Sequence, residues 1–197
     1  MGLVPFCGLN FVTRPGLVMT PRPASERLVQ AAIGLVGDRP AHVADVGTGS
    51  GALAVSIAAR AARARVWATD SSPAAVELAC ENVRRHGLLH RVVVLEGHLL
   101  DPVPGPVDLV VANLPYLPLA ERARHADLAD EPLEAVFAPD DGLEPYRRML
   151  EAAEERLAPA GAVVLQFRRQ VLHAGRGRLG LLRARLEHET MLVREAA

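Results

Sequence analysis

The sequence contains no lysine and only two cysteines, and both features exclude classes of chemistry. All 22 basic residues of the 197-residue chain are arginines. Without lysine, the chain has no amine for a Schiff base and no lysine for a Walker-type phosphate loop. Cys7 and Cys80 lie far apart and form no Cys-x-x-Cys pair, so we expect neither a disulfide framework nor a thiolate metal site. No metal ion is expected in the functional site.

Long apolar runs and a strong net charge are also missing. No run approaches about 18 apolar residues without charge or proline, so we expect no membrane span and no membrane partner. The formal net charge of −1 does not favour a protein that coats a polyanion. The N-terminus has no basic start followed by a long apolar centre, which argues against a signal peptide. We therefore expect a cytoplasmic protein, as a monomer.

The order of apolar patterns along the chain indicates the fold. The sequence is 50% hydrophobic, which at this length suits one well-formed core. Short β-branched runs alternate with helical patterns, as is typical of βαβ units around a parallel sheet. Strands are predicted at His42–Val46, Arg65–Thr69, Val92–Glu96, Val107–Ala112 and Ala162–Phe167. Helices are predicted at Ala52–Ala62, at Pro73–His86 with Ser72 as N-cap, and at Leu143–Leu157.

The two ends of the chain add further elements. An amphipathic stretch from Ser25 to Leu35 precedes the first predicted strand. Strands at about Leu181–His188 and Met191–Arg194 are predicted to close one edge of the sheet as a hairpin. The predicted fold class is α/β: a Rossmann-like, doubly wound, mostly parallel seven-stranded sheet with a C-terminal antiparallel hairpin. We expect residues 1–197 to form a single domain.

The segment DVGTGSGA, from Asp45 to Ala52, follows the first predicted strand. Its glycines allow a tight turn close to a ligand, and the next helix directs its free N–H groups to the same place. The spacing also fits the dinucleotide pattern GxGxxA, so it leaves NAD(P) and S-adenosylmethionine both open. Asp70 ends the second strand, where a carboxylate can accept from ribose hydroxyls of either cofactor. Asp45 favours the methyl donor, because D-x-G-x-G-x-G resembles the first motif of methyltransferases of this fold.

The segment VDLVVANLPYLP begins as a buried strand and ends in the tetrapeptide Asn113–Tyr116. In an open parallel sheet, this loop opens into the ligand crevice at the carboxyl ends of the strands. A planar nitrogen is a poor nucleophile that has to be held and turned. The Asn113 carboxamide can accept one of its N–H groups and the Leu114 carbonyl the other, while Pro115 stiffens the loop. Tyr116 can stack on the flat group, so the loop indicates methyl transfer to nitrogen without a strong base.

Together, these motifs resemble the HemK/PrmC group of protein-glutamine N-methyltransferases, whose hallmark is Asn-Pro-Pro-Tyr. The resemblance covers nearly the whole chain. FCGLNF (Phe6–Phe11) and PGLVMTPRPASE (Pro15–Glu26) resemble the segment that those enzymes place over the substrate, and DEPLEAVFAPDDGLEPYRRML (Asp130–Leu150) resembles their Asp-Gly-Leu-x-x-Tyr-Arg region. The resemblance implies S-adenosylmethionine as donor. It implies as acceptor a glutamine side-chain amide in a protein, typically the Gly-Gly-Gln loop of a translation release factor, or else a ribosomal protein.

The resemblance also implies the roles of individual residues. The predicted catalytic residues are Asn113, Leu114, Pro115 and Tyr116. The predicted cofactor contacts are Asp45, Gly47, Thr48, Gly49, Gly51, Asp70, Ser71, His98 and Asn113. The predicted substrate contacts are Phe11, Arg22, Pro23, Glu131 and Tyr146, with residues 1–36 as the substrate-covering segment.

Three positions depart from the family pattern. Leu114 replaces the first proline of the hallmark, and Asn-Leu-Pro-Tyr is similar to the loop of ribosomal RNA adenine dimethylases. His98 stands where the family has an acid that meets the adenine amino group, so either His98 makes that contact or Asp101 reaches it. The family's helical N-terminal domain has no counterpart ahead of Phe6.

These departures keep other functions open. An adenine-N6 methyltransferase acting on RNA or DNA is the first alternative, supported by Leu114 and by an arginine run without acidic residues. That run consists of Arg168, Arg169, Arg176, Arg178, Arg183 and Arg185. It suits either a nucleic acid or a solvated face. A non-catalytic binding protein of methyltransferase fold is the second alternative, while an NAD(P) dehydrogenase lacks residues for hydride chemistry.

Overall fold

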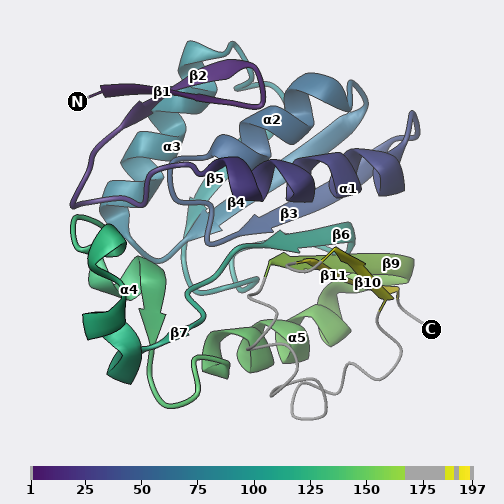
Figure 1. The fold of residues 1–197 in the computed structure, drawn as a ribbon. Coiled ribbons are helices and arrows are strands. Elements are labelled where there is room, and N and C mark those ends of the chain that lie inside the picture. The colour runs from purple at the N-terminus through teal and green to yellow at the C-terminus, as the bar shows by residue number, and fades with distance from the viewer. Residues whose placement is uncertain (1, 167–184, 189–190, 196–197) are drawn as a thin grey trace.

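The computed structural model describes residues 2–166, 185–188 and 191–195, which form a central sheet with helices on both faces (Figure 1). The strand order is β10-β11-β9-β6-β3-β4-β5. The five strands β9, β6, β3, β4 and β5 are parallel to one another. Strand β11 pairs antiparallel with β9, and β10 pairs antiparallel with β11. The strands are β3 (Ala41–Val46), β4 (Ala64–Asp70), β5 (Val92–Glu96), β6 (Val107–Ala112), β9 (Leu157–Gln166), β10 (Arg185–His188) and β11 (Met191–Glu195). The predicted mostly parallel sheet is therefore confirmed.

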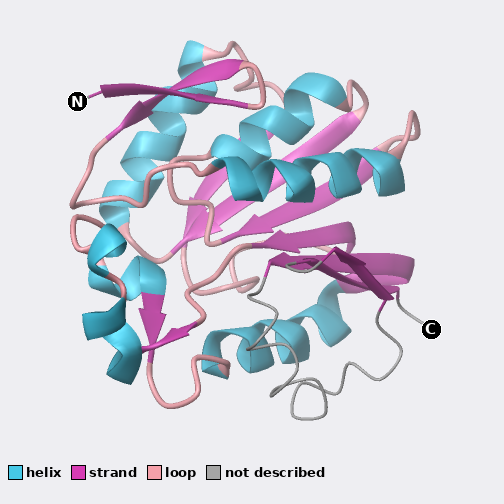
Figure 2. Cartoon of the chain, in the orientation of Figure 1, coloured by secondary structure: helices cyan, strands magenta, loops and turns pink. Residues whose placement is uncertain are grey.

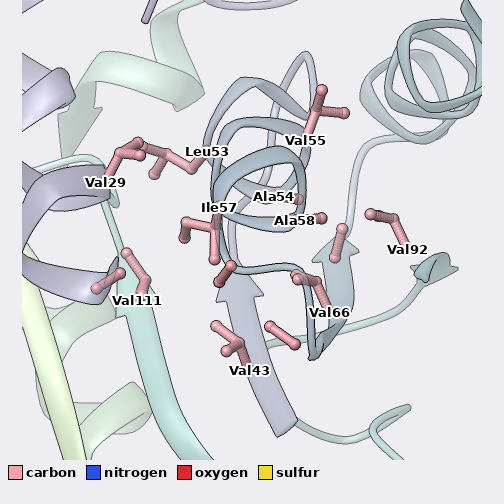
Figure 3. Close-up of a cluster of buried hydrophobic side chains, with 14 of the residues drawn as sticks. Val29, Val43, Leu53, Ala54, Val55, Ile57, Ala58, Val66, Val92 and Val111 are labelled. Carbon is pink, nitrogen blue, oxygen red and sulfur yellow. The ribbon is translucent and has the colours of Figure 1, made fainter. Parts of the chain in front are cut away.

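Helices cover the two faces unequally (Figure 2). One face carries α1, α2 and α3, and the other carries α5. On the first face, side chains of α2 such as Ile57 lie between Val29 of α1 and strand residues such as Val43 and Val111 (Figure 3). The helices are α1 (Glu26–Val36), α2 (Ala52–Arg60), α3 (Pro73–Arg85) and α5 (Glu144–Arg156). Strands buried on both sides read as near-continuous apolar runs, which is why the sequence predicts them well.

The strand order fixes where a ligand can bind. From β3 the chain proceeds outward through β4 to β5, and then returns to β6 on the other side of β3. The carboxyl ends of β3 and β6 therefore flank the point where the strand order reverses. Crevices for ligands in open α/β sheets lie at this point.

Local signals in the sequence explain most element ends. Ser72 caps α3 as predicted, accepting a hydrogen bond from the backbone N–H of Ala75 at 3.4 Å. The prediction for the last helix and strand is wrong at their junction, because β9 begins at Leu157 and not at Ala162. Pro159 disfavours helical geometry in the residue before it, so the chain becomes extended immediately after α5.

Some predicted features lie outside the described residues. These are the end of the last predicted parallel strand at Phe167, the first four residues of the predicted strand Leu181–His188, and five arginines of the run that ends at Arg185. Among the residues that are described, no helix has the length and apolar character needed to cross a bilayer.

Small elements frame the carboxyl edge of the sheet. An N-terminal hairpin packs on α3, where buried Asn82 bonds the backbone N–H and C=O of Val12 and the carbonyl of Ser50. This amide therefore ties the N-terminal segment to the glycine loop. The small elements are β1 (Gly2–Phe6), β2 (Leu9–Thr13), η1 (Pro23–Ser25), β7 (Leu117–Pro118), η2 (Leu119–Arg124), η3 (Ala126–Leu128), α4 (Leu133–Val136) and β8 (Phe137–Ala138).

Candidate functional site

A cavity of about 280 Å³ opens at the carboxyl ends of β3, β4 and β6. Its wall combines segments that are distant in the sequence: residues 17–19, 46–47, 49, 69–72, 75, 97–99, 113–115, 132, 134–135 and 145. The glycine loop, the end of β4 and the Asn113 loop thus meet at one place, as the sequence predicts. Pockets at such switch points are the default ligand sites of α/β folds.

The glycine loop is held against the end of β4. The backbone N–H groups of Gly47 and Thr48 both donate to the carbonyl of Thr69 at 2.9 Å. Gly47 has φ +69°, and a Cβ there would lie 2.7 Å from Cδ2 of Leu114. Glycine at this position therefore permits both the left-handed backbone and the close approach of the Leu114 side chain.

Asp70 is fixed in the cavity wall by two backbone donors. Its Oδ2 accepts from the N–H of Gly49 and its Oδ1 accepts from the N–H of Ser72, both at 2.9 Å. A carboxylate has about four acceptor positions, so each oxygen can accept a further hydrogen bond. The geometry thus presents a rigid pair of acceptors to the cavity, next to Ser71, which also lines it.

Asp45 lies beneath the glycine loop and not in the cavity. It is fully buried, and its Oδ2 accepts from Oγ1 of Thr48 at 2.6 Å and from the N–H of Ala54 at 3.1 Å. Neither Asp45, Thr48 nor Gly51 lines the cavity in this structure, and a direct cofactor contact of these residues stays a prediction. Their side chains and backbone instead set the shape of the loop.

Burial raises the pKa of Asp45 to about 7, and the charge of nearby Asp70 adds to this shift. A carboxyl whose pKa is higher in the folded than in the unfolded chain stabilises the fold below its unfolded pKa. That stabilisation is lost as the pH rises from about 4 to about 7. Ionising Asp45 costs more free energy in the folded than in the unfolded chain, because among the described residues its Oδ1 has no hydrogen-bond partner.

Asp45→Asn is expected to flatten the pH dependence of stability. In the parent protein, ionisation of this carboxyl should lower the free energy of unfolding by on the order of 4 kcal/mol as the pH rises from 4 to 8. Asparagine retains an acceptor for Thr48 and Ala54 but does not titrate. Urea denaturation at several pH values in this range measures the free energy of unfolding. If that free energy falls with pH as steeply in the variant as in the parent, the raised pKa of Asp45 is contradicted.

Two hydroxyls hold the Asn113 loop. Nδ2 of Asn113 donates to Oγ of Ser25 at 3.2 Å, which leaves Oδ1 of Asn113 as the acceptor for a ligand. Oη of Tyr146 lies 2.9 Å from the carbonyl oxygen of Leu114 and 2.7 Å from that of Gln166. Asn113, Leu114 and Pro115 all line the cavity. A carbonyl oxygen has two lone pairs, so Leu114 can accept from Tyr146 and from a ligand together.

Tyr146 and Phe11, which are predicted to contact a substrate, are fully buried in this structure. Tyr146 belongs to the core beneath the site, and burial raises the pKa of its hydroxyl well above the usual range. Phe11 packs against the rings of Phe6 and His86, with centroid separations of 6.1 Å and 5.1 Å. Tyr146 therefore supports the Asn113 loop, whereas Phe11 belongs to the core on the other face of the sheet.

Tyr116 is half-buried and does not line the cavity, and its stacking on a ligand stays a prediction. Its carbonyl oxygen approaches Gly142 so closely that a Cβ on Gly142 would lie 2.4 Å away. Gly142 also has φ +78°, which only glycine adopts at little cost. The Asp-Gly-Leu turn thus fixes the path of the chain just after the Asn113 loop.

Arg22 and Glu131 pair with each other outside the cavity. Oε1 of Glu131 accepts from Nη2 of Arg22 at 3.2 Å, and Oε2 accepts from the N–H of Thr20 at 3.1 Å. This joins the N-terminal segment to the chain just before α4. Pro23 begins η1, and neither it nor the ion pair lines the cavity, so the three predicted substrate contacts stay predictions.

His98 lines the cavity and is exposed, whereas Asp101 does not line it. Of the two residues considered for the adenine contact, His98 therefore has the suitable position. Within the described ranges, no three His, Cys, Asp or Glu side chains gather as metal ligands.

Sequence reasoning missed several residues of the cavity wall. Leu17, Val18, Met19, Glu134, Ala135 and Pro145 line it but were not singled out. They lie within the two segments Pro15–Glu26 and Asp130–Leu150 that carried the family resemblance. The resemblance could locate these segments, but no periodic pattern in them indicates which side chains face inward.

Comparison with known proteins agrees with this arrangement. The model of the family described as ribosomal protein L11 methyltransferase (PrmA) matches residues 29–127, about half of the chain. A release factor glutamine methyltransferase from Moorella thermoacetica is 42% identical over 165 residues, which are 82% of this chain and 58% of the relative. One from Gloeobacter violaceus is 40% identical over 153 residues, covering 76% and 54%. The chain thus spans little more than half the length of these relatives.

Among solved structures, a ribosomal protein L11 methylase from Lactobacillus delbrueckii subsp. bulgaricus superposes with a TM-score of 0.66. It is 21% identical, and the match covers 93% of this chain and 83% of that one. This likeness shows a shared Rossmann-like methyltransferase fold, for which family and fold imply S-adenosylmethionine as methyl donor. The chain therefore matches the methyltransferase family that the PrmA model describes, and it belongs to the HemK/PrmC group that its curated relatives represent.

Proposed function

We propose that the protein transfers the methyl group of S-adenosylmethionine to the side-chain amide nitrogen of a glutamine in a protein. The acceptor that we propose is the Gly-Gly-Gln loop of a translation release factor. One observation carries the proposal: Oδ1 of Asn113 and the carbonyl of Leu114 belong to adjacent residues in the cavity wall. Two neighbouring acceptors suit the two N–H groups of a primary amide.

The residues of the cavity fit the cofactor. Asp70 would accept from the ribose hydroxyls, His98 and Ser71 would contact the adenosine, and the backbone of Gly47 and Gly49 would approach it closely. The bound donor supplies an electrophilic methyl group on a sulfonium ion. Asp45, Thr48 and Gly51 would act through the shape of the loop.

Positioning accounts for the rate in this proposal. The amide nitrogen is a weak nucleophile because its lone pair is delocalised. Asn113 and Leu114 would hold its two N–H groups and turn the lone pair toward the methyl group. Holding the reacting atoms about 3–3.5 Å apart can lower the barrier by roughly 7–11 kcal/mol. Formation of the N–C bond would break the S–C bond of the sulfonium, whose electrons stay on sulfur as a neutral thioether. The nitrogen would release its extra proton to solvent, so no strongly basic side chain is needed.

The remaining parts of the chain have roles in the same proposal. Residues 1–36 would cover the acceptor, since Leu17 to Met19 reach the cavity and Glu131 fastens this segment. A seven-stranded sheet that includes the C-terminal hairpin would form a single domain, which would act as a monomer. Tyr116 would stack on the acceptor only if the loop rearranges when the acceptor binds.

A second function rests on Leu114. The exocyclic amino group of adenine presents two N–H groups on a planar nitrogen, and the same two acceptors suit it. Leucine in place of the first proline gives the loop that resembles RNA adenine dimethylases. This alternative predicts binding to RNA that weakens steeply with salt.

Incubation with labelled S-adenosylmethionine distinguishes these functions. A bacterial release factor and unmodified ribosomal RNA are offered separately, with Asn113→Ala as control, and the label is mapped by mass spectrometry. We expect label on the Gly-Gly-Gln glutamine. Label on adenine alone would favour the second function. Label on neither would leave an acceptor of another kind or a non-catalytic binding protein, and absence of cofactor binding in calorimetry would favour the non-catalytic protein.

A further inference from the structure

Ser25 stands at the N-cap position of α1 but does not cap the helix. Its side chain makes no capping hydrogen bond, and its backbone has φ −81° and ψ −8°. The residue has this helical geometry because η1 runs directly into α1, so the N–H of Glu26 already donates to the carbonyl of Pro23. A capping serine normally has an extended backbone that directs its oxygen to the helix N–H groups. The Ser25 hydroxyl therefore points elsewhere.

The hydroxyl instead meets the Asn113 carboxamide across 88 positions of sequence, with Oγ 3.2 Å from Nδ2. Ser25 is only 6% exposed, so water does not readily replace it. The contact joins the N-terminal segment to the loop that follows the central strand β6. The contact engages the Nδ2 side of the amide, so the Oδ1 side is left for the cavity.

We propose that Ser25 is the positioning residue that selects the productive orientation of the Asn113 carboxamide. The inference rests on the proposed function, because it concerns how Asn113 presents an acceptor to the substrate nitrogen. The terminal torsion of asparagine has two broad minima that exchange oxygen and nitrogen. In one orientation Oδ1 accepts from the substrate N–H. In the other, Nδ2 meets that N–H, and two donors face each other.

Ser25 resolves this ambiguity by binding Nδ2. A serine hydroxyl can act as donor or acceptor, and the selection that we propose requires Oγ to accept. The structure assigns the acceptor role to Oγ, with Nδ2 as donor. The N-terminal segment would thus have a second role besides covering the cavity, because its Ser25 sets which end of the Asn113 amide, oxygen or nitrogen, faces the substrate.

The first experiment compares Ser25→Ala, Ser25→Thr and Ser56→Ala. Ser56→Ala is the matched control, because it removes another buried hydroxyl, from α2, that does not line the cavity. With labelled S-adenosylmethionine and a bacterial release factor, kcat of Ser25→Ala should fall about three- to tenfold, as expected for losing one neutral hydrogen bond. The cofactor's dissociation constant should stay unchanged, and Ser25→Thr should restore kcat.

Asn113→Asp gives a sharper version of this test. A carboxylate offers oxygen in both orientations, so it needs no selection. In this background, Ser25→Ala should change kcat by less than about twofold. Three outcomes would overturn the inference: an unchanged kcat in Ser25→Ala, an equal loss of kcat in Ser25→Thr, or the same loss in the parent and Asn113→Asp backgrounds. In each case Ser25 would affect only the folding of the protein or have no effect on catalysis.

NMR separates this inference from the proposed function. The side-chain NH2 signals of Asn113 in ¹⁵N-labelled protein report the contact with Ser25 whether or not any acceptor is methylated. They should shift in Ser25→Ala and stay near their original positions in Ser25→Thr and Ser56→Ala. If the parent methylates no release factor but these shifts occur, the proposed function fails while the orientation by Ser25 stands. Signals unmoved in Ser25→Ala would refute that orientation.

Discussion

Asn113→Ala is expected to lower kcat at least about 100-fold while changing the cofactor's dissociation constant by less than about twofold. The substitution removes Oδ1, one of the two acceptors that would turn the amide nitrogen toward the methyl group. Loss of one preorganised polar group in a transition state typically costs about 10²–10³ in kcat. Asn113 contributes little to holding the donor in this proposal, since Asp70, the glycine loop and His98, which also line the cavity, would make the main donor contacts.

Single-turnover methylation of the release factor and calorimetric titration of S-adenosylmethionine measure these two quantities. Asn10→Ala is a matched control, because Asn10 is exposed on β2 and does not line the cavity. A large rise in the cofactor's dissociation constant without a fall in kcat would assign Asn113 to donor binding. The loop would then need a different catalytic acceptor.

The sequence predicts the fold well where burial and periodicity coincide. The parallel strands are buried on both faces, so their apolar runs identify them, and Ser72-Pro73 marks the start of α3. The strand order then brings the ends of β3, β4 and β6 together, which places Gly47, Asp70 and Asn113 at one cavity. Motif order along the chain suffices for this part of the site, because the fold itself converts that order into proximity.

The sequence predicts less well which motif residues face the ligand. Motif spacing places Asp45 and Tyr146 near the site, but it does not say that both side chains point into the protein. For Tyr146, a signal was present: with Met149, Leu150 and Ala153 it forms an i, i+3, i+4, i+7 stripe, which is the buried face of α5. For Ser25, no local signal exists, because its partner Asn113 is reached only through the tertiary fold.

Asp70→Ala is expected to raise the dissociation constant of S-adenosylmethionine about 100-fold. Hydrogen bonds to a charged group contribute roughly 1.5–3 kcal/mol each, and a carboxylate between two ribose hydroxyls makes two of them. The substitution also frees the backbone N–H groups of Gly49 and Ser72, which loosens the wall of the cavity. With saturating cofactor, kcat should stay within about threefold of the parent value, because Asp70 does not touch the reacting nitrogen in this mechanism.

Two further variants make this result specific. Asp70→Asn keeps one oxygen acceptor and should give an intermediate dissociation constant, because the amide retains a bond to one hydroxyl and loses the charge. Asp127→Ala removes an exposed carboxylate of η3 that does not line the cavity, and it should bind the cofactor like the parent. Equal affinities for parent and Asp70→Ala would place the ribose elsewhere. If Asp70→Ala and Asp127→Ala weaken cofactor binding equally, the effect would reflect the overall charge of the protein. Added salt should then reduce the difference in affinity from the parent.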